Sequence, residues 1–188
     1  MFQDLIRSEI LNVDKTNKKR VHHIDRYILY TYIDNNCLDV YFLEDANGTT
    51  IASTYVEHIT IQNKKYLRPV NVAVLDEFKG KRLAGKMYNI ISWKTRMSII
   101  SDVEQTEDGR KLWHNFNKTV GSHIYVINTK TGKKISNDID DAYTDWHNDP
   151  QGLQTALVFE ADVNRTRVIH EDVIIFDQPK YSKYDNML

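Results

Sequence analysis

Val72-Ala73-Val74-Leu75-Asp76-Glu77-Phe78-Lys79-Gly80-Lys81-Arg82-Leu83-Ala84-Gly85-Lys86-Met87-Tyr88 is an apolar run, then a short basic loop, then an apolar stripe at helical spacing. This order predicts a strand, a turn, and a helix over residues 80–94. The amino end of a helix offers unpaired N–H groups and a partial positive charge. Glycine lets a phosphate approach the backbone closely, and two of the chain's seven glycines, Gly80 and Gly85, lie here. The stretch therefore predicts a pyrophosphate site.

Four cationic side chains lie in or beside this loop, namely Lys79, Lys81, Arg82 and Lys86. The whole chain has 25 Lys and Arg against 26 Asp and Glu, so its net charge is −1. Such a balance argues against a protein built for non-specific nucleic-acid binding. The alternative interpretation of the cluster is a solvated helix turn, although cations oppose the helix dipole at that end. The loop matches neither a Walker A motif nor a dinucleotide-binding fingerprint.

Outward from this stretch, the apolar patterns predict a single α+β domain over residues 1–188. Residues 1–20 are expected to form an N-terminal helix and loop, and residues 177–188 a polar tail. An antiparallel meander precedes the central helix, and shorter strands and helices follow it. The expected strands are 26–33, 38–44, 50–62, 65–75, 97–101, 123–128, 153–160 and 167–176, and the other helices are 2–11, 106–117 and 138–146.

The loop and the order of elements resemble the Gcn5-related N-acetyltransferases. The later stretch 98–113, a strand that ends in Ser-Asp and leads into a helix with Gly-x-x-Leu-Trp, resembles phage-type members of that superfamily. The family opens its central helix with the pattern Arg/Gln-x-x-Gly-x-Gly/Ala. Lys79 stands at the first position and Ala84 at the last. Gly80 and Lys81 match the common Arg-Gly-Lys-Gly form. Arg82 occupies the place of the central glycine, where its side chain could either crowd the pyrophosphate or pair with a phosphate.

The resemblance covers residues 20–127 and implies a central mixed, mostly antiparallel sheet flanked by helices. It implies acetyl-CoA as co-substrate and direct transfer of the acetyl group to a primary amine. The acceptor, a protein or a small molecule, is not identified by the sequence. The implied cofactor-binding residues are two strand residues, through their backbone, and the loop that follows: Val72, Val74, Lys79, Gly80, Lys81, Arg82, Leu83, Ala84, Gly85 and Lys86.

The resemblance also places candidate catalytic bases at strand ends that face the thioester. Asp102 follows the strand 97–101, and Glu57 lies late in the strand 50–62, next to His58. Only one of Glu57 and His58 can face the cleft, because neighbouring strand side chains alternate. Each residue also has a plainer interpretation. Asp102 would be a turn or helix-leading carboxylate, and the other two would be surface residues.

Trp113 stands where typical members of the family carry a tyrosine that protonates the departing thiolate. Indole has no transferable proton, so that acid is lost or supplied elsewhere. His114 is one candidate, and a solvated helix residue is its plainer interpretation. Arg82 and Trp113 together favour an alternative function, a catalytically inactive acetyltransferase-like module that binds a partner or belongs to a virion.

The remaining sequence features concern the redox environment, metal binding and cellular location. Cys37 is the single cysteine, which excludes an internal disulfide and a Cys-rich zinc site and indicates a reducing compartment. His22 and His23 have no carboxylate or cysteine at ligand spacing, so no metal site is predicted. The sequence shows no apolar run of about 18 residues and no signal peptide, so we expect no membrane partner. We expect a cytoplasmic location, in the host if the chain is phage-encoded. Acceptor choice is expected in the loop 12–24 and in the region 129–152, which matches no known pattern.

Overall fold

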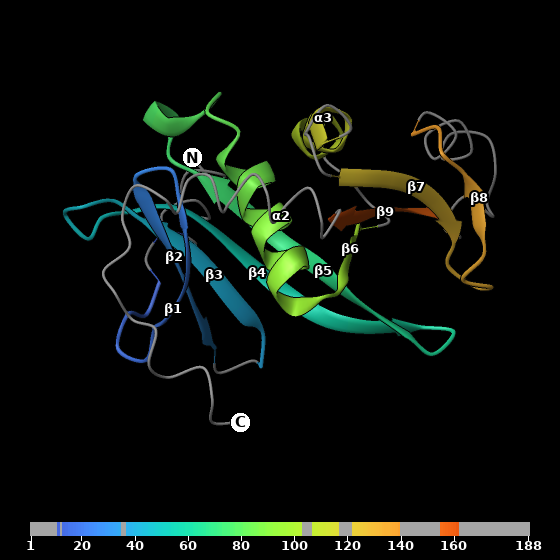
Figure 1. Cartoon of the computed structure of the whole chain (residues 1–188), viewed down its shortest axis with the longest axis horizontal. Coiled ribbons are helices and arrows are strands. Elements are labelled where there is room, and N and C mark those ends of the chain that lie inside the picture. Colours follow the sequence, from blue (N-terminus) through green and yellow to red (C-terminus); the bar gives the residue numbers. More distant parts are fainter. Residues whose placement is uncertain are drawn as a thin grey trace, which may run out of the picture.

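The computed structural model describes residues 11, 13–34, 37–102, 107–116, 122–139 and 155–161. These residues form one nine-stranded sheet in the order β1-β2-β3-β4-β5-β6-β9-β7-β8 (Figure 1). The strands are β1 (Lys19–Ile24), β2 (Tyr27–Ile33), β3 (Asp39–Glu44), β4 (Thr50–Ile61), β5 (Lys64–Val74), β6 (Ser98–Ile100), β7 (Ser122–Asn128), β8 (Lys134–Ser136) and β9 (Thr155–Ala161). The helices are η1 (Asp76–Phe78), a 3-10 turn, and the α-helices α2 (Leu83–Thr95) and α3 (Glu107–Phe116).

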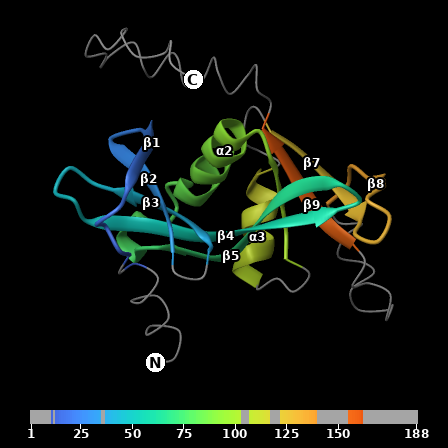
Figure 2. The ribbon, with the colours of Figure 1, turned by 90° about the horizontal axis from the view of Figure 1, so that it is seen from below.

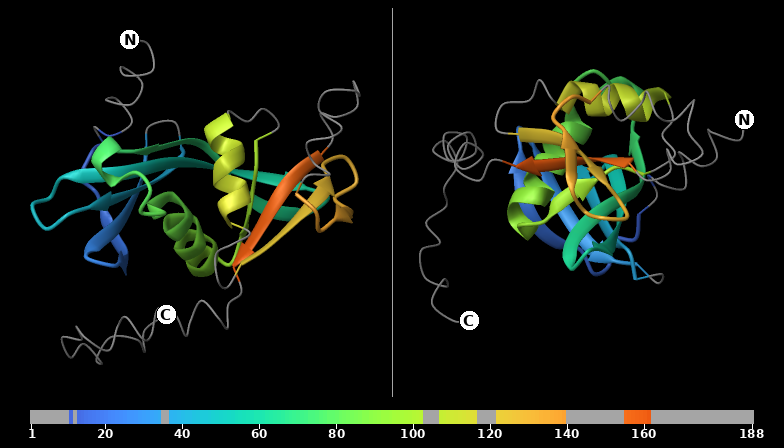
Figure 3. Two further views of the ribbon diagram at one scale, coloured as in Figure 1. Left: turned by 90° about the horizontal axis from the view of Figure 1, so that it is seen from above. Right: turned by 90° about the vertical axis from the view of Figure 1, so that its right-hand side faces the viewer.

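Neighbouring strands pair antiparallel everywhere except between β5 and β6, which run parallel. A parallel pair needs a crossover connection, usually a helix, and α2 is that connection. The α+β class with a mixed, mostly antiparallel sheet is therefore confirmed. Figure 2 shows α2 lying against the sheet, and Figure 3 shows α3 at the boundary between the β1–β5 half and the β6–β9–β7–β8 half.

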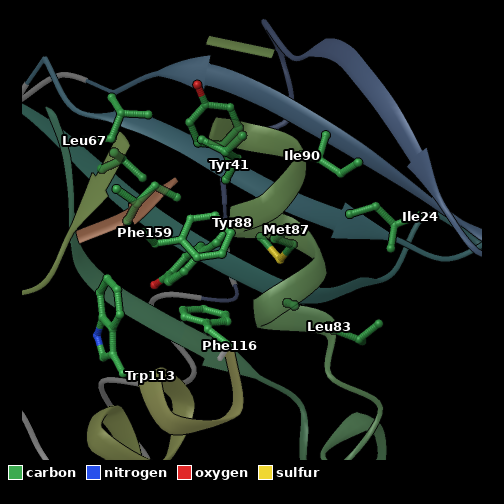
Figure 4. Close-up of a cluster of buried hydrophobic side chains, with 14 of the residues drawn as sticks. Ile24, Tyr41, Leu67, Leu83, Met87, Tyr88, Ile90, Trp113, Phe116 and Phe159 are labelled. Carbon is green, nitrogen blue, oxygen red and sulfur yellow. The ribbon is translucent and has the colours of Figure 1, made fainter. Parts of the chain in front are cut away.

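The main hydrophobic core forms around α2, because its apolar stripe faces the sheet. Leu83, Met87 and Ile90 have almost no exposed surface. They pack in one cluster with strand residues and with two aromatic residues of α3, Trp113 and Phe116 (Figure 4). Burial of such a stripe is what stabilises a helix in a small domain. The core therefore fixes α2, and with it the loop that precedes α2.

Two strands, β1 and β8, lie in segments for which the sequence pattern predicts no strand. Lys19–Ile24 forms β1, which pairs with β2 at one edge of the sheet, although residues 12–24 had been predicted as a loop. Lys134–Ser136 forms β8 at the other edge, inside the unassigned segment 129–152. Both strands are short and polar, as edge strands commonly are, so they lack the strong apolar alternation of a central strand.

Several predicted segments fall wholly or mainly outside the described residues: the helices 2–11 and 138–146, the strand 167–176 and the tail 177–188. Leu11 is helical, while Asp138 and Ile139 are not. Among the described residues, no helix is long and apolar enough to cross a bilayer. The other predicted strands and helices are present, with ends that differ by at most three residues.

A polar cluster ties β5, β6, β7 and β9 together where these four strands meet. Glu160 Oε1 accepts hydrogen bonds from Lys64 Nζ (2.9 Å), Ser98 Oγ (2.9 Å) and the Tyr125 hydroxyl (2.7 Å). Partial burial opposes ionisation of Glu160, but these three bonds outweigh it, so the pKa of Glu160 lies below its ordinary value. The cluster joins strands from distant parts of the sequence at the end where β5 and β6 are still paired.

Acidification is therefore expected to destabilise this end of the sheet through Glu160. A carboxyl with a lowered pKa in the folded state stabilises the fold above its ordinary pKa, about 4.3, and this contribution is lost as the pH falls through the lowered value. Melting temperatures measured between about pH 7 and pH 3 should show the largest gap between the native chain and Glu160→Gln near neutrality. The gap should close in acid. A gap that stays constant with pH, or that appears equally in the exposed control Glu77→Gln, would contradict this role.

Candidate functional site

The strand β5 separates from β6 after Leu67, in the first half of its length. The two strands pair only at Tyr66–Ser98 and Leu67–Ile99. Beyond this point the register between β4 and β5 shifts, because Val56 lies opposite Pro69 and Tyr55 opposite Asn71. Val70 is thus an extra residue in β5, and such a bulge bends and twists its strand.

The bulge leaves the second half of β5 open on one side. Val70, Asn71 and Val72 are exposed, and Val70 and Val72 are two of the few exposed large apolar residues of the described chain. Within the described ranges, no strand pairs with β5 on the β6 side after Leu67. A ligand with an amide-containing chain could bond to the backbone along this edge.

The larger of two cavities at this opening has a volume of about 570 Å³. All the predicted cofactor-binding residues except Lys81 and Lys86 line it, so the structure brings the strand residues and the loop to one place. Its volume lies in the range of pockets that hold small-molecule cofactors. The lining residues are Val72, Ala73, Val74, Phe78, Lys79, Gly80, Arg82, Leu83, Ala84, Gly85, Lys111, Leu112, Asn115 and Phe116.

The loop at one end of this cavity has an unusual backbone. The helix begins at Leu83 rather than at Gly80 as predicted, because Gly80 (φ +77°) and Arg82 (φ +57°) both have positive φ angles. Arg82 is the N-cap residue and makes no capping bond with its side chain, and its carbonyl accepts the first helical bond from Lys86 N–H at 3.0 Å. A left-handed conformation costs an L-residue on the order of 1–2 kcal/mol, and such strain is found preferentially at ligand sites.

The four cationic side chains predicted to act together have different surroundings in the structure. Lys86 Nζ is paired with Asp25 (2.5 Å), and Lys79 Nζ with Asp76 (2.5 Å). Lys81 Nζ lies over the ring of Phe78, 4.4 Å from its centroid. Lys79 nevertheless lines the cavity, whereas Lys81 and Lys86 do not.

The helix α3 adds two polar residues that the sequence analysis did not single out. Lys111 and Asn115 lie four positions apart, on one face of α3, and both line the larger cavity. Their spacing is a signal that sequence reasoning could have used. It was missed because only the tertiary structure brings α3 to the loop before α2. Gly85 makes this approach possible, since a Cβ atom there would lie 3.0 Å from Phe116 Cε1.

A smaller cavity of about 230 Å³ adjoins the first one, and Val72 and Leu112 line both. Asp102 contributes its only carboxyl group among the described lining residues. The neighbouring Ser101 fixes the chain here, because its N–H donates to Leu157 O (2.8 Å) and its Oγ accepts from Leu157 N–H (3.0 Å). The lining residues are Pro69, Val70, Asn71, Val72, Tyr88, Ser101, Asp102, Gly109, Leu112 and Trp113.

Glu57, the second predicted base, lines neither cavity. It is hydrogen-bonded to Arg68 Nε, on the neighbouring strand. This bond is the main reason why the pKa of Arg68 is raised, and the negative charges of Glu57 and Asp102 both add to the effect. The charges of both predicted bases therefore act on Arg68.

The histidines considered from the sequence lie elsewhere. His58 Nε2 is 2.7 Å from Asp39 Oδ2, on β3, so it faces away from Glu57. His114 is exposed on α3, and the ring of His22 contacts Trp93. The residues that the structure describes hold no group of three or more possible metal ligands.

Two aromatic rings line the smaller cavity, Trp113 from α3 and Tyr88 from α2. From the sequence pattern alone, Tyr88 is only one of the apolar positions of its helix. Burial raises the pKa of Tyr88 above its usual range, against the effect of a hydrogen bond with Thr54. Burial therefore favours the neutral form of Tyr88.

Comparisons with known proteins gave weak structural likeness only. No protein-family model matches the chain, and no curated protein matches it by significant similarity. One solved structure is a GCN5-related glucosamine N-acetyltransferase region of a fungal multi-domain GH3 β-N-acetylglucosaminidase, with TM-score 0.35 and 13% identity, covering 48% of this chain and 13% of that chain. Another is the NatB acetyltransferase complex bound to CoA and MES, with TM-score 0.37 and 14% identity, covering 71% of this chain and 72% of that chain. Values this low do not transfer an activity to the chain described above.

Proposed function

We propose that the chain is an N-acetyltransferase, which binds acetyl-CoA in the larger cavity and passes the acetyl group directly to a primary amine in the smaller one. The observation that carries the proposal is the pair of adjoining cavities along the open edge of β5. One ends at a strained basic loop before a helix, and the other contains a carboxylate. Membership of the phage-type group, a single domain over residues 1–188 and a cytoplasmic location remain part of the proposal.

The loop supplies the chemistry that a pyrophosphate needs. The first N–H groups of α2 have no partner within the helix, and the helix dipole adds a partial positive charge. Arg82, Lys79 and Lys111 surround this end of the cavity with cationic side chains. The pantetheine arm would then run along Val72 and Val74, whose strand edge offers backbone N–H and C=O groups. The thioester would lie near Val72, where the two cavities meet.

Transfer at that point requires few groups. The amine nitrogen bonds to the thioester carbon, the C–S bond breaks, and the sulfur leaves as a thiolate. Asp102 takes the proton that the amine gives up, and backbone N–H groups of the β5 edge stabilise the oxyanion. Trp113 has no acidic proton, and burial raises the pKa of Tyr88, which disfavours it as the proton donor. The thiolate is therefore protonated from solvent or by the proton that Asp102 received.

Calorimetric titration with acetyl-CoA tests the proposal directly. Binding at micromolar to submillimolar concentration, followed by amine-dependent release of free thiol, is the expected result. Absence of binding at millimolar acetyl-CoA would overturn the proposal and favour the alternative, an inactive binding or virion-associated module. That alternative is supported by Arg82 in place of the family's central glycine and by Trp113 in place of its tyrosine.

Arg82→Gly decides whether the arginine binds a phosphate or obstructs it. Glycine adopts the positive φ angle at Arg82 without strain, so the variant should gain stability, by about 0.5–1 kcal/mol after the entropy of the unfolded chain is included. If Arg82 holds a phosphate, acetyl-CoA affinity should nevertheless fall about tenfold, the scale of one charge-assisted hydrogen bond. Thermal melts and calorimetry measure the two effects, with Lys130→Ala, at an exposed turn, as the control. Higher affinity in Arg82→Gly would show that the arginine obstructs the site.

A further inference from the structure

Two β-hairpins that are far apart in the sequence meet at one end of the molecule. One joins β4 to β5 and the other joins β7 to β8, and both turns lie at the right-hand end of Figure 1. Gln62 Nε2, in the first turn, donates a hydrogen bond to Lys130 O, in the second (2.6 Å). Gly132 (φ +66°) allows this close packing, because a Cβ atom there would lie 3.2 Å from Gln62 Cβ. The two turns therefore form one surface.

Exposed lysines make this surface cationic. Glu160 pairs with one of them, Lys64 (2.9 Å), and within the described ranges the other three form no ion pair. Lys65 adds a further exposed cation on the opposite face of its strand. The whole chain has a net charge of −1, so its positive charge is unevenly distributed. The four lysines, called the basic hairpin surface below, are Lys64, Lys130, Lys133 and Lys134.

Aromatic rings hold two of these ammonium groups on one face of the sheet. Lys64 Nζ lies 5.3 Å from the ring centroid of Tyr66, and Lys134 Nζ lies 4.9 Å from that of Tyr125. Both tyrosines belong to the apolar cluster on the face away from α2, because Leu67, the neighbour of Tyr66, packs in the cluster with α2. A lysine that is already held in place loses less rotamer freedom when it binds a ligand. The surface therefore presents its charges before a partner arrives.

The chemistry of the surface favours the phosphates of a nucleic acid. All four cations are lysines, which pair with phosphate as point charges, whereas arginine is the usual partner where a carboxylate is bound in a planar, bidentate geometry. Several separate cations match a polymer with one charge per unit better than a single small anion. In the two turns and β8, Ile135 is the only large apolar side chain exposed among the described residues. One such side chain is too little apolar surface for insertion into a bilayer.

We propose that the basic hairpin surface binds the phosphate backbone of a nucleic acid, without regard to its base sequence. The lysines pair with successive phosphates, and each contact releases counterions from the nucleic acid. The strand β5 has 11 residues and separates this surface from the loop before α2, a distance of roughly 35 Å at about 3.3 Å per residue. The site is therefore distinct from the proposed acetyl-CoA cavity and does not depend on acetyl transfer.

Fluorescence anisotropy of a labelled oligothymidylate tests the inference on the full chain without acetyl-CoA. The native chain should bind the probe at about 50 mM salt, and the logarithm of the association constant should fall against the logarithm of salt concentration with a slope of about −2 to −3, the value for three or four phosphates on a single strand. In the double variant Lys133→Gln/Lys134→Gln, the affinity should fall at least about fivefold and the slope should shrink by about 1.4. A duplex of the same length is the second probe, and the tighter of the two identifies the form of nucleic acid.

The matched control is the double variant Lys19→Gln/Arg20→Gln, which removes two consecutive exposed cations from β1, the opposite edge strand of the sheet. Its affinity for the probe should stay within about twofold of the native value, because charges farther away than a Debye length are screened. Thermal melts confirm that both double variants remain folded. Equal weakening in the two variants would show that net charge, not this surface, attracts the probe, and would overturn the inference.

Three further outcomes overturn the inference. The first is absence of binding at low salt by both nucleic-acid probes. The second is tighter binding of decaglutamate or of phosphatidylserine vesicles than of either nucleic acid, which would assign the surface to an acidic protein or to a lipid surface. The third is displacement of the probe by acetyl-CoA without any effect of the Lys133 and Lys134 substitutions, which would place the probe at the loop before α2.

Discussion

Asp102→Asn is expected to slow acetyl transfer by about 10²–10⁴-fold, the usual effect of removing a general base. The amide has the size of the carboxylate but cannot accept the proton of the attacking amine. Asp102 follows β6 directly, and the two bonds between Ser101 and Leu157 hold the chain at that point. The substitution should therefore leave the backbone and the larger cavity in place.

The measurement is the initial rate of thiol release at saturating acetyl-CoA, together with the dissociation constant of acetyl-CoA from calorimetry. The rate should fall and the dissociation constant should stay within about twofold. Asp138→Asn, which changes an exposed carboxylate outside both cavities, serves as the matched control and should retain the native rate. A loss of less than about threefold in Asp102→Asn would remove this residue from the mechanism and direct attention to the Glu57–Arg68 pair.

Phe116→Ala is expected to destabilise the chain by about 3–5 kcal/mol, the largest effect on stability that we predict. The Phe116 ring is almost wholly buried, and its centroid lies 5.2 Å from that of Phe159, 5.4 Å from Tyr88 and 5.5 Å from Trp113. It also packs on Gly85, in the first turn of α2. Its removal would leave a cavity between α2, α3 and β9, and α3 would lose its anchor.

Denaturant unfolding measures this effect, and Phe116→Leu is the control, because leucine keeps most of the volume and should cost less than about 2 kcal/mol. Acetyl-CoA affinity should fall in Phe116→Ala as well, since Phe116, Lys111 and Leu112 all line the larger cavity. A loss of stability below about 1 kcal/mol would mean that α3 is not held by this ring. Unchanged acetyl-CoA affinity in a folded Phe116→Ala would mean that α3 is not part of the binding site.

Local patterns were sufficient to predict most of the sheet and its class. The alternation and β-branched residues of the central strands and the apolar stripe of α2 are strong because those segments are buried on the sheet. The helix start was predicted three residues early, at Gly80 instead of Leu83, because helical spacing does not report a positive φ angle at Arg82. The edge strands β1 and β8 were missed because an edge strand needs less apolar surface.

The residues of the candidate site fall into two groups, those that local sequence patterns predict and those that only the tertiary structure reveals. The residues in and next to the loop could be predicted, because a basic loop before a helix indicates an anion-binding site from local sequence alone. Three further residues become candidates only through neighbours that are distant in the sequence, namely Lys111, Arg68 and Tyr88. Lys111 lines the same cavity as the loop, the charges of Glu57 and Asp102 act on Arg68, and Tyr88 lines the smaller cavity with Asp102. Gly85, predicted to make room for a phosphate, in addition makes room for Phe116.

The amino-acid sequence by itself determined the α+β class, the central strand–loop–helix unit and the position of the basic loop, since each depends on residues within about one turn or one strand of each other. The tertiary structure decided which cations line the cavity, how β5 separates from β6, and which side chains surround Asp102. The physical reason is that charge pairing and cavity shape depend on distances in space. A chain can specify such distances only after its core has fixed α2 and α3 on the sheet.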